Sequence, residues 1–266
     1  MEHRSFTALG GDCELFRAGI GTGTLAEAEA WIHRMHDRLT RFSETSELSH
    51  FNAGSGEWTP VSDELGALLH ESLRAYEVSD GLVHAATLPA LLAAGYTRDF
   101  SLGGTQPGPV PPPPAPLPEL LEVRTGEARL RRGAAIDLGG IAKGWLADRL
   151  AERLGASCLV NLCGDLYARG TGETGAGWPV GFGDRTVLLE DTGAATSGVT
   201  KRTWGTGLHH LIDPRTSRPA VTDLREVSVL AKTAADAEIY AKIALLLGSE
   251  AAPKWLEGRA LGWSLT

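Results

Sequence analysis

The chain has 266 residues, a length that suits one large domain or two small ones. Its hydrophobic fraction of 42% can form a sizeable core, and a charged fraction of 22% is ordinary for a globular protein. The net charge of −8 and the lack of a basic run argue against a nucleic-acid-binding protein.

Cysteine usage and hydropathy bear on the compartment. The three cysteines, Cys13, Cys158 and Cys163, form no CxxC pair, which favours a reducing compartment over a disulfide framework. The N-terminal residues lack the apolar core of a signal peptide, and no run approaches the roughly 18 apolar residues of a membrane span. We therefore expect a cytoplasmic, soluble protein without membrane insertion.

The N-terminal part predicts a strand followed by a helix. Residues 5–18 are typical of an opening strand that Gly10-Gly11 interrupts, as at a bulge or a close backbone approach. Thr24 is a candidate cap for a helix that runs to about Arg41, because apolar residues then recur at helical spacing. The polar face of this helix carries two histidines three residues apart; a solvated face is favoured over a metal site there.

A second helix is predicted at roughly 63–78, with Ser62 as its cap and Asp80-Gly81 at its end. The apolar residues 82–95 suggest another short helix or turn. Residues 101–118 contain eight prolines, which predicts an extended surface loop, because proline lacks an N–H and fixes φ. We favour this loop over a proline-rich ligand for a signalling partner, and we treat residues 1–266 as a single domain.

The segment 134–148 is the first that points to chemistry. The apolar run 134–136 ends at Asp137, Gly139-Gly140 breaks the pattern, and helical spacing begins at Ile141. A strand, a tight glycine turn and a helix N-terminus with Lys143 on its first turn suit an anion, most simply a phosphate. The alternative is an ordinary helix start with a surface lysine.

The remaining segments mix strands with one long helix. A hairpin is predicted at 123–130, and a strand at 158–162 leads into Cys163-Gly-Asp165. The further predicted elements are strands near 166–170, 178–183, 186–190, 194–197, 208–216, 226–232 and 259–266, and a helix at 234–247. Long helices paired with antiparallel-looking strands predict an α+β fold of mixed or antiparallel sheets with packed helices, in two intimately associated halves.

Several stretches resemble, in order, one protein family. The chain resembles the FAD:protein FMN transferases, once described as thiamine-biosynthesis lipoproteins. The resemblance spans about residues 5–250 and is carried by Phe42-Ser43, Ser46-Glu-Leu-Ser49, Asn52, Asp80-Gly81, Asp137-Leu-Gly-Gly-Ile-Ala-Lys-Gly144, Asn161, Gly164-Asp165, Ala195-Thr-Ser-Gly198, Arg202, His210-Leu-Ile-Asp-Pro-Arg-Thr216, Thr233 and Ala235-Asp236.

The resemblance implies an activity. Such enzymes split FAD at its pyrophosphate, release AMP and attach FMN by a phosphoester to a threonine or serine of an acceptor protein. A divalent metal, usually Mg²⁺, assists. The expected fold then has an FAD cleft between its two halves, and the expected partners are FAD and the acceptor protein, with no nucleic acid.

Site roles follow from the same resemblance. The Gly140 carbonyl and the Asp236 carboxylate would hold the metal, and Lys143 would lie near the FAD phosphates or adenine. His210 would position the pyrophosphate or act as a general acid–base, with Asp236 and Lys143 in the catalytic set. The wider FAD-binding set would be Asn52 (towards the flavin), Asp80, Gly139, Gly140, Lys143, Asp165, Thr196, Ser197, Gly198, Arg202 (supporting the site or pairing with phosphate) and His210. Asp213, before Pro214, is expected to form a turn. The alternatives to the site roles are a structural histidine for His210 and a surface charge for Arg202.

The chain departs from the family pattern in four places. Val83-His84-Ala85-Ala86 replaces a polar stretch, Tyr240 stands where a threonine is usual, Cys163 replaces a glycine, and the lipoprotein signal is not seen. Two alternatives to transfer therefore stay open. One is an FAD-binding protein with lost or weak transferase activity, and the other is an FAD pyrophosphatase that gives FMN and AMP.

Overall fold

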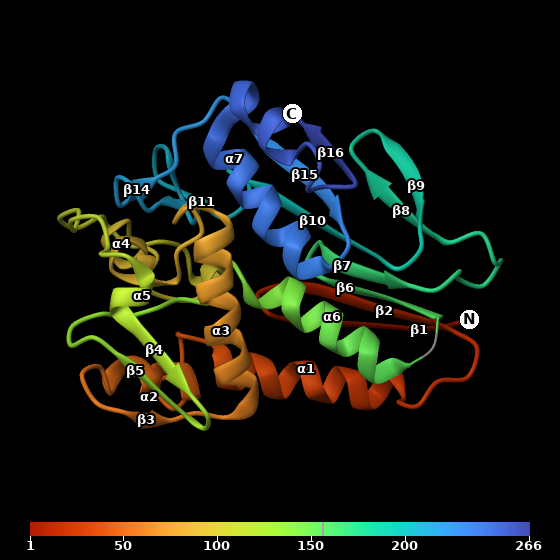
Figure 1. Ribbon diagram of the computed structural model, residues 1–266, viewed down its shortest axis with the longest axis horizontal. Helices are drawn as coiled ribbons and strands as arrows, with labels where there is room; N and C mark the ends of the chain where they lie inside the picture. Colours follow the sequence, from red (N-terminus) through yellow and green to blue (C-terminus); the bar gives the residue numbers. More distant parts are fainter. Residues whose placement is uncertain (156) are drawn as a thin grey trace. The chain divides into compact units, whose positions relative to one another are not determined.

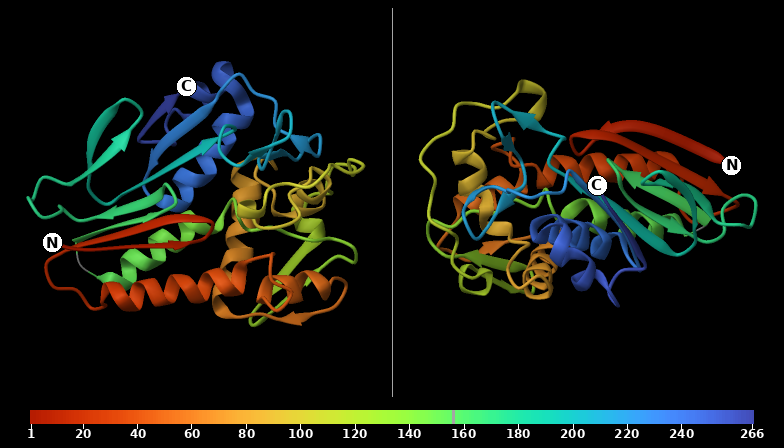
Figure 2. Two further views of the ribbon diagram at one scale, coloured as in Figure 1. Left: turned by 180° about the vertical axis from the view of Figure 1, so that it is seen from behind. Right: turned by 90° about the horizontal axis from the view of Figure 1, so that it is seen from above.

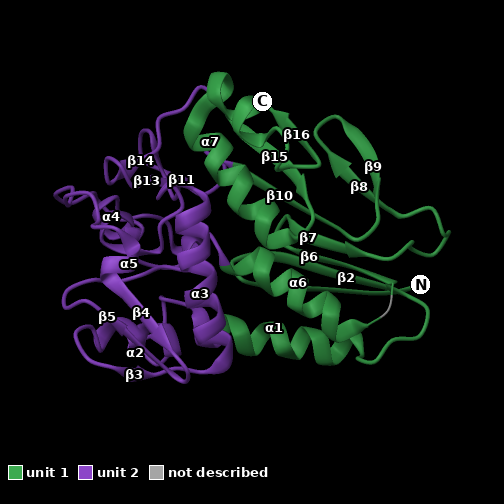
Figure 3. Cartoon of the chain, in the orientation of Figure 1, with its two compact units in different colours: residues 1–36, 142–197, 224–266 green, residues 37–141, 198–223 purple. Residues whose placement is uncertain are grey.

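The computed structural model describes residues 1–155 and 157–266, and the chain divides into two compact units (Figure 3). Unit 1 comprises residues 1–36, 142–197 and 224–266. Unit 2 comprises residues 37–141 and 198–223. The chain passes between the units inside two of the predicted motifs, at Ile141/Ala142 and at Ser197/Gly198.

Unit 1 is built on a sheet that, in the described residues, has seven strands in the order β1-β2-β6-β7-β10-β15-β16 (Figure 1). The strands are β1 (Glu2–Ala8), β2 (Gly11–Ala18), β6 (Ser157–Leu162), β7 (Asp165–Arg169), β10 (Thr192–Gly198), β15 (Glu226–Ala231) and β16 (Gly262–Leu265). The pairs β1–β2, β2–β6, β6–β7, β7–β10 and β15–β16 are antiparallel.

The sheet of unit 1 is covered on both faces. Helices α6 (Ala142–Leu154) and α7 (Ala234–Leu256) pack against each other and on one face (Figures 1 and 2). The hairpin of β8 (Trp178–Phe182) and β9 (Arg185–Leu189) packs on the other face, where its apolar side chains join a cluster with those of β6, β7 and β10: Leu159, Leu166, Ala168, Trp178, Val180, Leu189 and Ala194. Because strand side chains alternate in direction, a sheet buried on both faces needs apolar residues on both.

Capping side chains fix the helix starts. Before α1 (Leu25–Leu39), the hydroxyl of Thr24 accepts the N–H of Glu27 (3.1 Å), and the carboxylate of Glu27 accepts the N–H of Thr24 (2.8 Å). This reciprocal pair is a capping box. In unit 2, Ser62 caps α3 (Asp63–Val78) by accepting the N–H of Leu65. Both predicted caps are thus confirmed.

Unit 2 combines α3 with a three-stranded sheet and shorter elements. The sheet has the order β3-β5-β4, from β3 (Thr59–Pro60), β4 (Leu121–Arg124) and β5 (Glu127–Leu130). The other elements are α2 (Glu47–Ala53), a 3-10 helix at Ala85–Thr87, α4 (Leu88–Ala93), a 3-10 helix at Phe100–Leu102, α5 (Leu117–Leu120), β11 (Thr203–Trp204), β12 (Leu208–His209), β13 (Ile212–Asp213) and β14 (Arg218–Pro219).

Three predicted elements are corrected by the structure. The segment 208–216, expected to be a strand that ends in a turn, instead holds the two short strands β12 and β13, which belong to different sheets. Residues 5–18 form no interrupted strand, because β1 already begins at Glu2 and Leu9-Gly10 turns the chain back into a β1–β2 hairpin. The run 134–136 is not a strand, and the following helix begins at Ala142. The α+β class with packed helices and a largely antiparallel sheet is confirmed; the single-domain reading and the cleft between halves stay predictions.

The predicted loop at 101–118 has no regular secondary structure over residues 103–116 and is mostly exposed, while its two ends lie in the 3-10 helix at Phe100–Leu102 and in α5. It is anchored within unit 2: the carbonyl of Ala115 bonds to His84, the Ser217 hydroxyl donates to the carbonyl of Pro112, and the Gly108 N–H donates to Ala93. None of the described helices is both long and apolar enough to cross a lipid bilayer.

Candidate functional site

The segment before the glycine turn is held by a side chain rather than by a neighbouring strand. Asn52 donates its amide to the carbonyl of Ile136 (2.9 Å) and accepts the N–H of Ile136 (2.8 Å). The next N–H, that of Asp137, donates to the carbonyl of Ala85. These bonds satisfy the backbone that a strand would otherwise pair. Asn52 therefore supports the approach to Gly139-Gly140, and its contact with a flavin stays a prediction.

Asp137 organises the start of the turn itself. Its carboxylate accepts the N–H of Gly139 (2.9 Å) and the Nε–H of Arg41 (2.8 Å). Arg41 also donates to the carbonyl of Tyr96 (2.8 Å), and its side chain is only 5% exposed. The guanidinium lies 4.2 Å from the centre of the Phe42 ring and 4.5 Å from that of Tyr96. Such a buried cation is stabilised by one carboxylate and two π faces.

Further aromatic side chains extend this group within unit 2. The rings of Tyr96 and Trp204 are centred 5.4 Å apart, and the indole N–H of Trp204 donates to the carbonyl of Ala94. Burial raises the pKa of Tyr96, and the positive charges of Arg202 and Arg41 oppose that rise. We call Arg41, Phe42, Tyr96, Asp137 and Trp204 the Arg41 cluster.

Unit 1 brings two helix starts together. A Cβ added at Gly144, on the first turn of α6, would lie only 2.4 Å from the carbonyl oxygen of Ala234, the first residue of α7. Glycine is therefore required for this approach. We call the group of Lys143, Gly144, Asp148, Asp165, Asp236 and Glu238 the α6–α7 junction.

Lys143 is held by two buried carboxylates at this junction. Its ammonium forms ion pairs with Asp165, at the start of β7, and with Glu238 of α7 (3.3 Å). The side chain of Lys143 is 16% exposed, and those of Asp165 and Glu238 are 3% and 4% exposed. Glu238 also accepts the N–H of Gly144 (2.9 Å). The structure thus brings Lys143 and Asp165 together, and it does not leave Lys143 as a surface lysine.

The N-terminus of α7 is capped twice. The carboxylate of Asp148 accepts the N–H groups of Ala234 (2.8 Å) and Ala235 (3.0 Å), and the hydroxyl of Thr233 accepts the N–H of Asp236 (3.0 Å). Burial, with a smaller contribution from the negative charge of Asp236, raises the pKa of Asp148 to about 6. Asp148 and Asp236 therefore interact through their charges.

These contacts revise the anion-site prediction. The Gly144 N–H on the first turn of α6, like the N–H groups at the start of α7, is already bonded to a side chain. Asp165 and Glu238 contact Lys143 directly, and Asp148 and Asp236 lie at the start of α7, so the net charge of the junction is negative and repels a phosphate. A divalent cation would reverse that balance locally.

The residues at the junction fit a hard, hydrated cation. Asp236 is half-buried on the first turn of α7, and its Oδ1 atom is buried. Within residues 1–155 and 157–266, no group of three or more His, Cys, Asp or Glu side chains has the arrangement of a metal site. Mg²⁺ typically takes one or two carboxylates and completes its shell with waters and substrate phosphates, so the single half-buried carboxylate of Asp236 is compatible with such an ion.

The other predicted residues of unit 1 lie on β10. The Thr196 hydroxyl is 2.9 Å from that of Ser228 on β15 and hydrogen-bonds to it, and Ser197 is half-buried. Gly198 is the last residue of β10 and the first of its segment in unit 2. In unit 2, Asp80 is exposed after α3 with a left-handed backbone (φ 48°), which suits a turn residue. Their contacts with FAD stay predictions.

The two adjacent histidines of unit 2 differ in their surroundings. His209 is buried, bonds through Nε2 to the carbonyl of Ala220 (3.1 Å) and accepts the N–H of Leu211 at Nδ1 (3.3 Å). Burial lowers the pKa of His209, which therefore favours the neutral ring. His210 is half-buried between β12 and β13. The structural histidine of the pair is His209, and the catalytic role of His210 stays a prediction.

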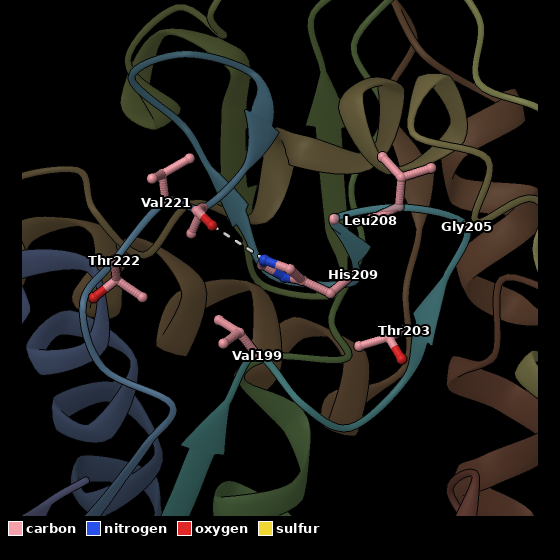
Figure 4. A pocket seen from close by; sticks show the side chains of 9 residues that line it. Val199, Thr203, Gly205, Leu208, His209, Val221 and Thr222 are labelled. Atoms are coloured by element: carbon pink, nitrogen blue, oxygen red, sulfur yellow. Dashed lines mark hydrogen bonds between the residues drawn. The ribbon is translucent and has the colours of Figure 1, made fainter.

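A hollow of about 360 Å³ lies beside His209 within unit 2 (Figure 4). In the figure the ring of His209 bonds to the Ala220 carbonyl, and Val199 and Leu208 border the space. The lining residues are Val199, Thr203, Gly205, Gly207, Leu208, His209, Ala220, Val221 and Thr222. Because both ring nitrogens of His209 are bonded to backbone, this lining offers contact surface rather than acid–base chemistry. The turn former Asp213 is confirmed nearby by its bond to the Arg215 N–H (2.9 Å).

Two departures from the family pattern have structural roles. In the stretch 83–86, His84 accepts the N–H of Ala86 and bonds to Ala115, so this stretch anchors the proline-rich loop. Tyr240 packs against an alanine cluster of unit 1 and lies edge-on to Trp255, with ring centres 5.3 Å apart. Its ring therefore serves packing on α7.

Comparison with known proteins now identifies the family. The family model described as the ApbE family matches residues 9–263, nearly the whole chain. The chain belongs to the ApbE family. An FAD:protein FMN transferase of Treponema pallidum is 32% identical over 266 residues, covering 85% of this chain and 72% of that protein. The Escherichia coli K12 FAD:protein FMN transferase is 28% identical, covering 88% and 75%.

Solved structures of ApbE proteins share the fold. The apo flavinyl transferase ApbE of Pseudomonas stutzeri matches with a TM-score of 0.81 at 22% identity, covering 100% of this chain and 94% of that one. The ApbE protein of Thermotoga maritima matches with a TM-score of 0.86 at 22% identity, covering 99% and 93%. The family resemblance and the fold predicted from the sequence are confirmed.

Sequence reasoning missed several charged or aromatic residues that the structure places beside the predicted ones. Glu238 follows Asp236 by two positions in a mostly apolar helix, where it is buried. An acidic residue in such an apolar stretch was the sequence signal that could have indicated this role. Asp148 closes the glycine motif, yet its capping partner lies 86 residues further on. Arg41 directly precedes the Phe42 motif, but nothing in the sequence pairs it with Asp137.

Proposed function

We propose that this chain transfers FMN from FAD to a threonine or serine side chain of an acceptor protein, releases AMP and requires a divalent metal ion, with Mg²⁺ as the expected ion. The observation that carries the proposal is the α6–α7 junction, where Lys143 and Asp236 of the family motifs lie on the first turns of two closely packed helices. The ApbE family membership and the names of the relatives support it.

The chemistry assigned to these residues is phosphoryl transfer. An acceptor hydroxyl oxygen attacks the FMN phosphorus in line, and AMP leaves with the bridging oxygen of the pyrophosphate. Asp236, with the Gly140 carbonyl as the predicted second ligand, would hold the metal. When bound, the metal neutralises charge that develops on the phosphate oxygens.

The chain's own side chains set the geometry of this step. Asp165 and Glu238 fix the Lys143 ammonium, which can then face a phosphate oxygen without losing further rotamer freedom. Asp148 and Thr233 hold the first turn of α7 and therefore the backbone from which Asp236 projects. Arg41 and Asp137 hold the glycine turn that precedes α6. His210 is the predicted group for positioning the pyrophosphate or moving the proton.

The test is a product analysis. The protein is incubated with FAD, MgCl₂ and a panel of synthetic peptides that each carry one threonine or serine. We expect AMP in the supernatant and an equal amount of peptide with the mass of an attached FMN. Free FMN with AMP would instead indicate a pyrophosphatase, and bound FAD without AMP would indicate a flavin-binding protein without transfer.

A further inference from the structure

Two of the three cysteines lie side by side in unit 1. Cys13 of β2 and Cys163, in the turn between β6 and β7, have sulfur atoms 3.9 Å apart. Both thiols also point at the carbonyl of Ala8, with sulfur–oxygen distances of 3.7 Å for Cys13 and 3.4 Å for Cys163. The two sulfurs thus share one small space at the end of the β1–β2 hairpin.

The strand register allows these sulfurs to bond. Cys13 lies opposite Leu162 in the antiparallel β2–β6 ladder, and Cys163 is the next residue. The ladder continues into the turn, because the N–H of Cys163 donates to the carbonyl of Asp12 (3.1 Å). Cys13 and Cys163 are therefore diagonal neighbours in this ladder, and their sulfurs, 3.9 Å apart, must approach to about 2.05 Å to bond. Disulfides span Cα separations of about 4.4–6.8 Å, so neighbouring strands can carry such a bond after a small shift of the turn.

The two thiols differ in access. Cys13 is fully buried, and the contact with Cys163 together with burial raises the pKa of its thiol well above the ordinary value. Cys163 is half-buried and has a left-handed backbone (φ 60°), which turns it out of the ladder. An oxidant dissolved in water therefore reaches Cys163 first, and Cys13 is placed to resolve the product.

We propose that Cys13 and Cys163 are a redox modification site that forms a reversible intramolecular disulfide in the presence of a peroxide. Hydrogen peroxide converts the Cys163 thiol to a sulfenic acid and is itself reduced to water. The Cys13 sulfur then attacks the Cys163 sulfur, the S–S bond forms, and the hydroxyl group leaves with the Cys13 proton as a second water. A small thiol reduces the disulfide back to two cysteines and is oxidised to its own disulfide.

The site has a consequence for the junction, and this part rests on the proposed function. Cys163 lies two residues before Asp165, the carboxylate that pairs with Lys143. A Cys163–Cys13 bond draws the Cys163-Gly164 turn towards the β1–β2 hairpin and so displaces the start of β7. Oxidation is therefore expected to loosen the hold on Lys143 and to weaken FAD binding.

Peptide mapping tests the disulfide without any assumption about function. The full-length protein is treated with hydrogen peroxide, its remaining thiols are alkylated, and it is digested without reduction. We expect a linked Cys13–Cys163 peptide that dithiothreitol removes, and an alkylated Cys158. Cys158 is the matched control: it is buried, its pKa is raised to about 12 by burial, and it packs near the carbonyl of Ala151.

Two cysteine variants test which residues form the link. Cys158→Ser should form the same link, whereas Cys13→Ser should form none and should carry a sulfinic or sulfonic acid at Cys163. Wild-type protein in which both cysteines are alkylated, or separately over-oxidised, would overturn the proposal. So would a link between either cysteine and Cys158.

The functional arm compares FAD binding by flavin fluorescence in the reduced and disulfide forms. We expect binding about fivefold weaker in the disulfide form, the size of losing one well-placed hydrogen bond. Cys13→Ser, reduced and compared with reduced wild type, should bind FAD equally well. Equal affinity of the two wild-type forms would disprove the coupling to the junction. Absence of FAD binding in the reduced protein would count against the proposed function, while the mapping still decides the disulfide.

Discussion

The α6–α7 junction of unit 1 and the Arg41 cluster of unit 2 each bury a cation and balance its charge differently. Lys143 contacts two carboxylates, those of Asp165 and Glu238, and the junction holds two more, those of Asp148 and Asp236. Arg41 has a single carboxylate partner, Asp137, and two aromatic rings. The first group carries surplus negative charge, and the second is electrically balanced.

This difference separates two tasks. A surplus of carboxylates attracts a divalent cation and so suits the chemical step at a pyrophosphate. A balanced guanidinium packed between rings gives a rigid support, because the planar fork of arginine keeps its hydrogen-bond geometry. We therefore expect changes at the junction to reduce activity more than stability, and changes in the Arg41 cluster to do the reverse.

The largest expected effect is on activity at Asp236. Asp236→Ala should lower kcat/KM for AMP release on the order of 100-fold or more, because charge neutralisation at the phosphates is lost. The fold should persist, since Thr233 and Asp148 cap α7 through backbone N–H groups. Asp184→Ala is the matched control, because that side chain is 92% exposed. Full Mg²⁺-dependent activity in Asp236→Ala would refute the metal assignment.

The next effect combines activity and stability at Lys143. Lys143→Met leaves Asp165 and Glu238 buried without their cation, which should lower the free energy of unfolding by about 3 kcal/mol. Adding Glu238→Gln should restore part of that stability, because glutamine still accepts the Gly144 N–H, yet AMP release should stay low. Urea unfolding and product analysis measure the two quantities. If Lys143→Met alone were as stable as wild type, the charges of Lys143, Asp165 and Glu238 would not be coupled.

A smaller effect on activity is expected at Arg41. Arg41→Ala leaves the carboxylate of Asp137 without its ion pair and removes two cation–π contacts, so unfolding should become easier by roughly 2–4 kcal/mol. Among molecules that remain folded, kcat should fall less than in Asp236→Ala. If Arg41→Ala abolished turnover at full stability, the contrast between support and chemistry would be wrong.

The remaining effects concern the pH dependence of stability, and they have opposite signs in the two units. The pKa of Asp148 is raised from 3.8 to about 6 when folded, so the folded state binds its proton more tightly than the unfolded state. This contribution to stability is present below pH 3.8 and is lost as the pH rises to about 6, on the order of 3 kcal/mol in all. Asp148→Asn should remove this dependence, which denaturant unfolding at several pH values measures.

His209 contributes in the other direction. Burial lowers its pKa below 6.5, so the unfolded state takes up a proton first as the pH falls. Stability from this group is present above about pH 6.5 and declines below it. His209→Gln should flatten the acid limb of the stability profile below about pH 6.5. An unchanged limb in that variant would assign the dependence to other groups.

The sequence predicted elements whose signals are local. Helix α3 matches its predicted bounds of 63–78, because a capping serine precedes a regular apolar period and a left-handed Asp80-Gly81 pair follows it. The prediction of a strand at 134–136 was wrong, because the backbone of Ile136 is hydrogen-bonded to the side chain of Asn52, 84 residues earlier in the chain, and not to another strand. An apolar run alone does not reveal such a partner.

The residues of the candidate site also divide into those with a local sequence signal and those without one. Lys143 could be singled out by residue type and spacing, and Asp236 by the resemblance to the family motifs. The burial of Glu238, the capping role of Asp148 and the Arg41–Asp137 pair, 96 residues apart, depend on how distant segments pack. No periodicity encodes those contacts, so they became visible only in the folded chain.

The most direct test of the central claim follows oxygen through the reaction. The protein is incubated with FAD, MgCl₂ and an acceptor peptide in water labelled with heavy oxygen, and the products are weighed by mass spectrometry. Direct transfer predicts AMP and flavinylated peptide in equal amounts, both without label, because the acceptor hydroxyl supplies the new bond to phosphorus. Labelled free FMN or AMP without a flavinylated peptide would contradict it, since water would then be the nucleophile.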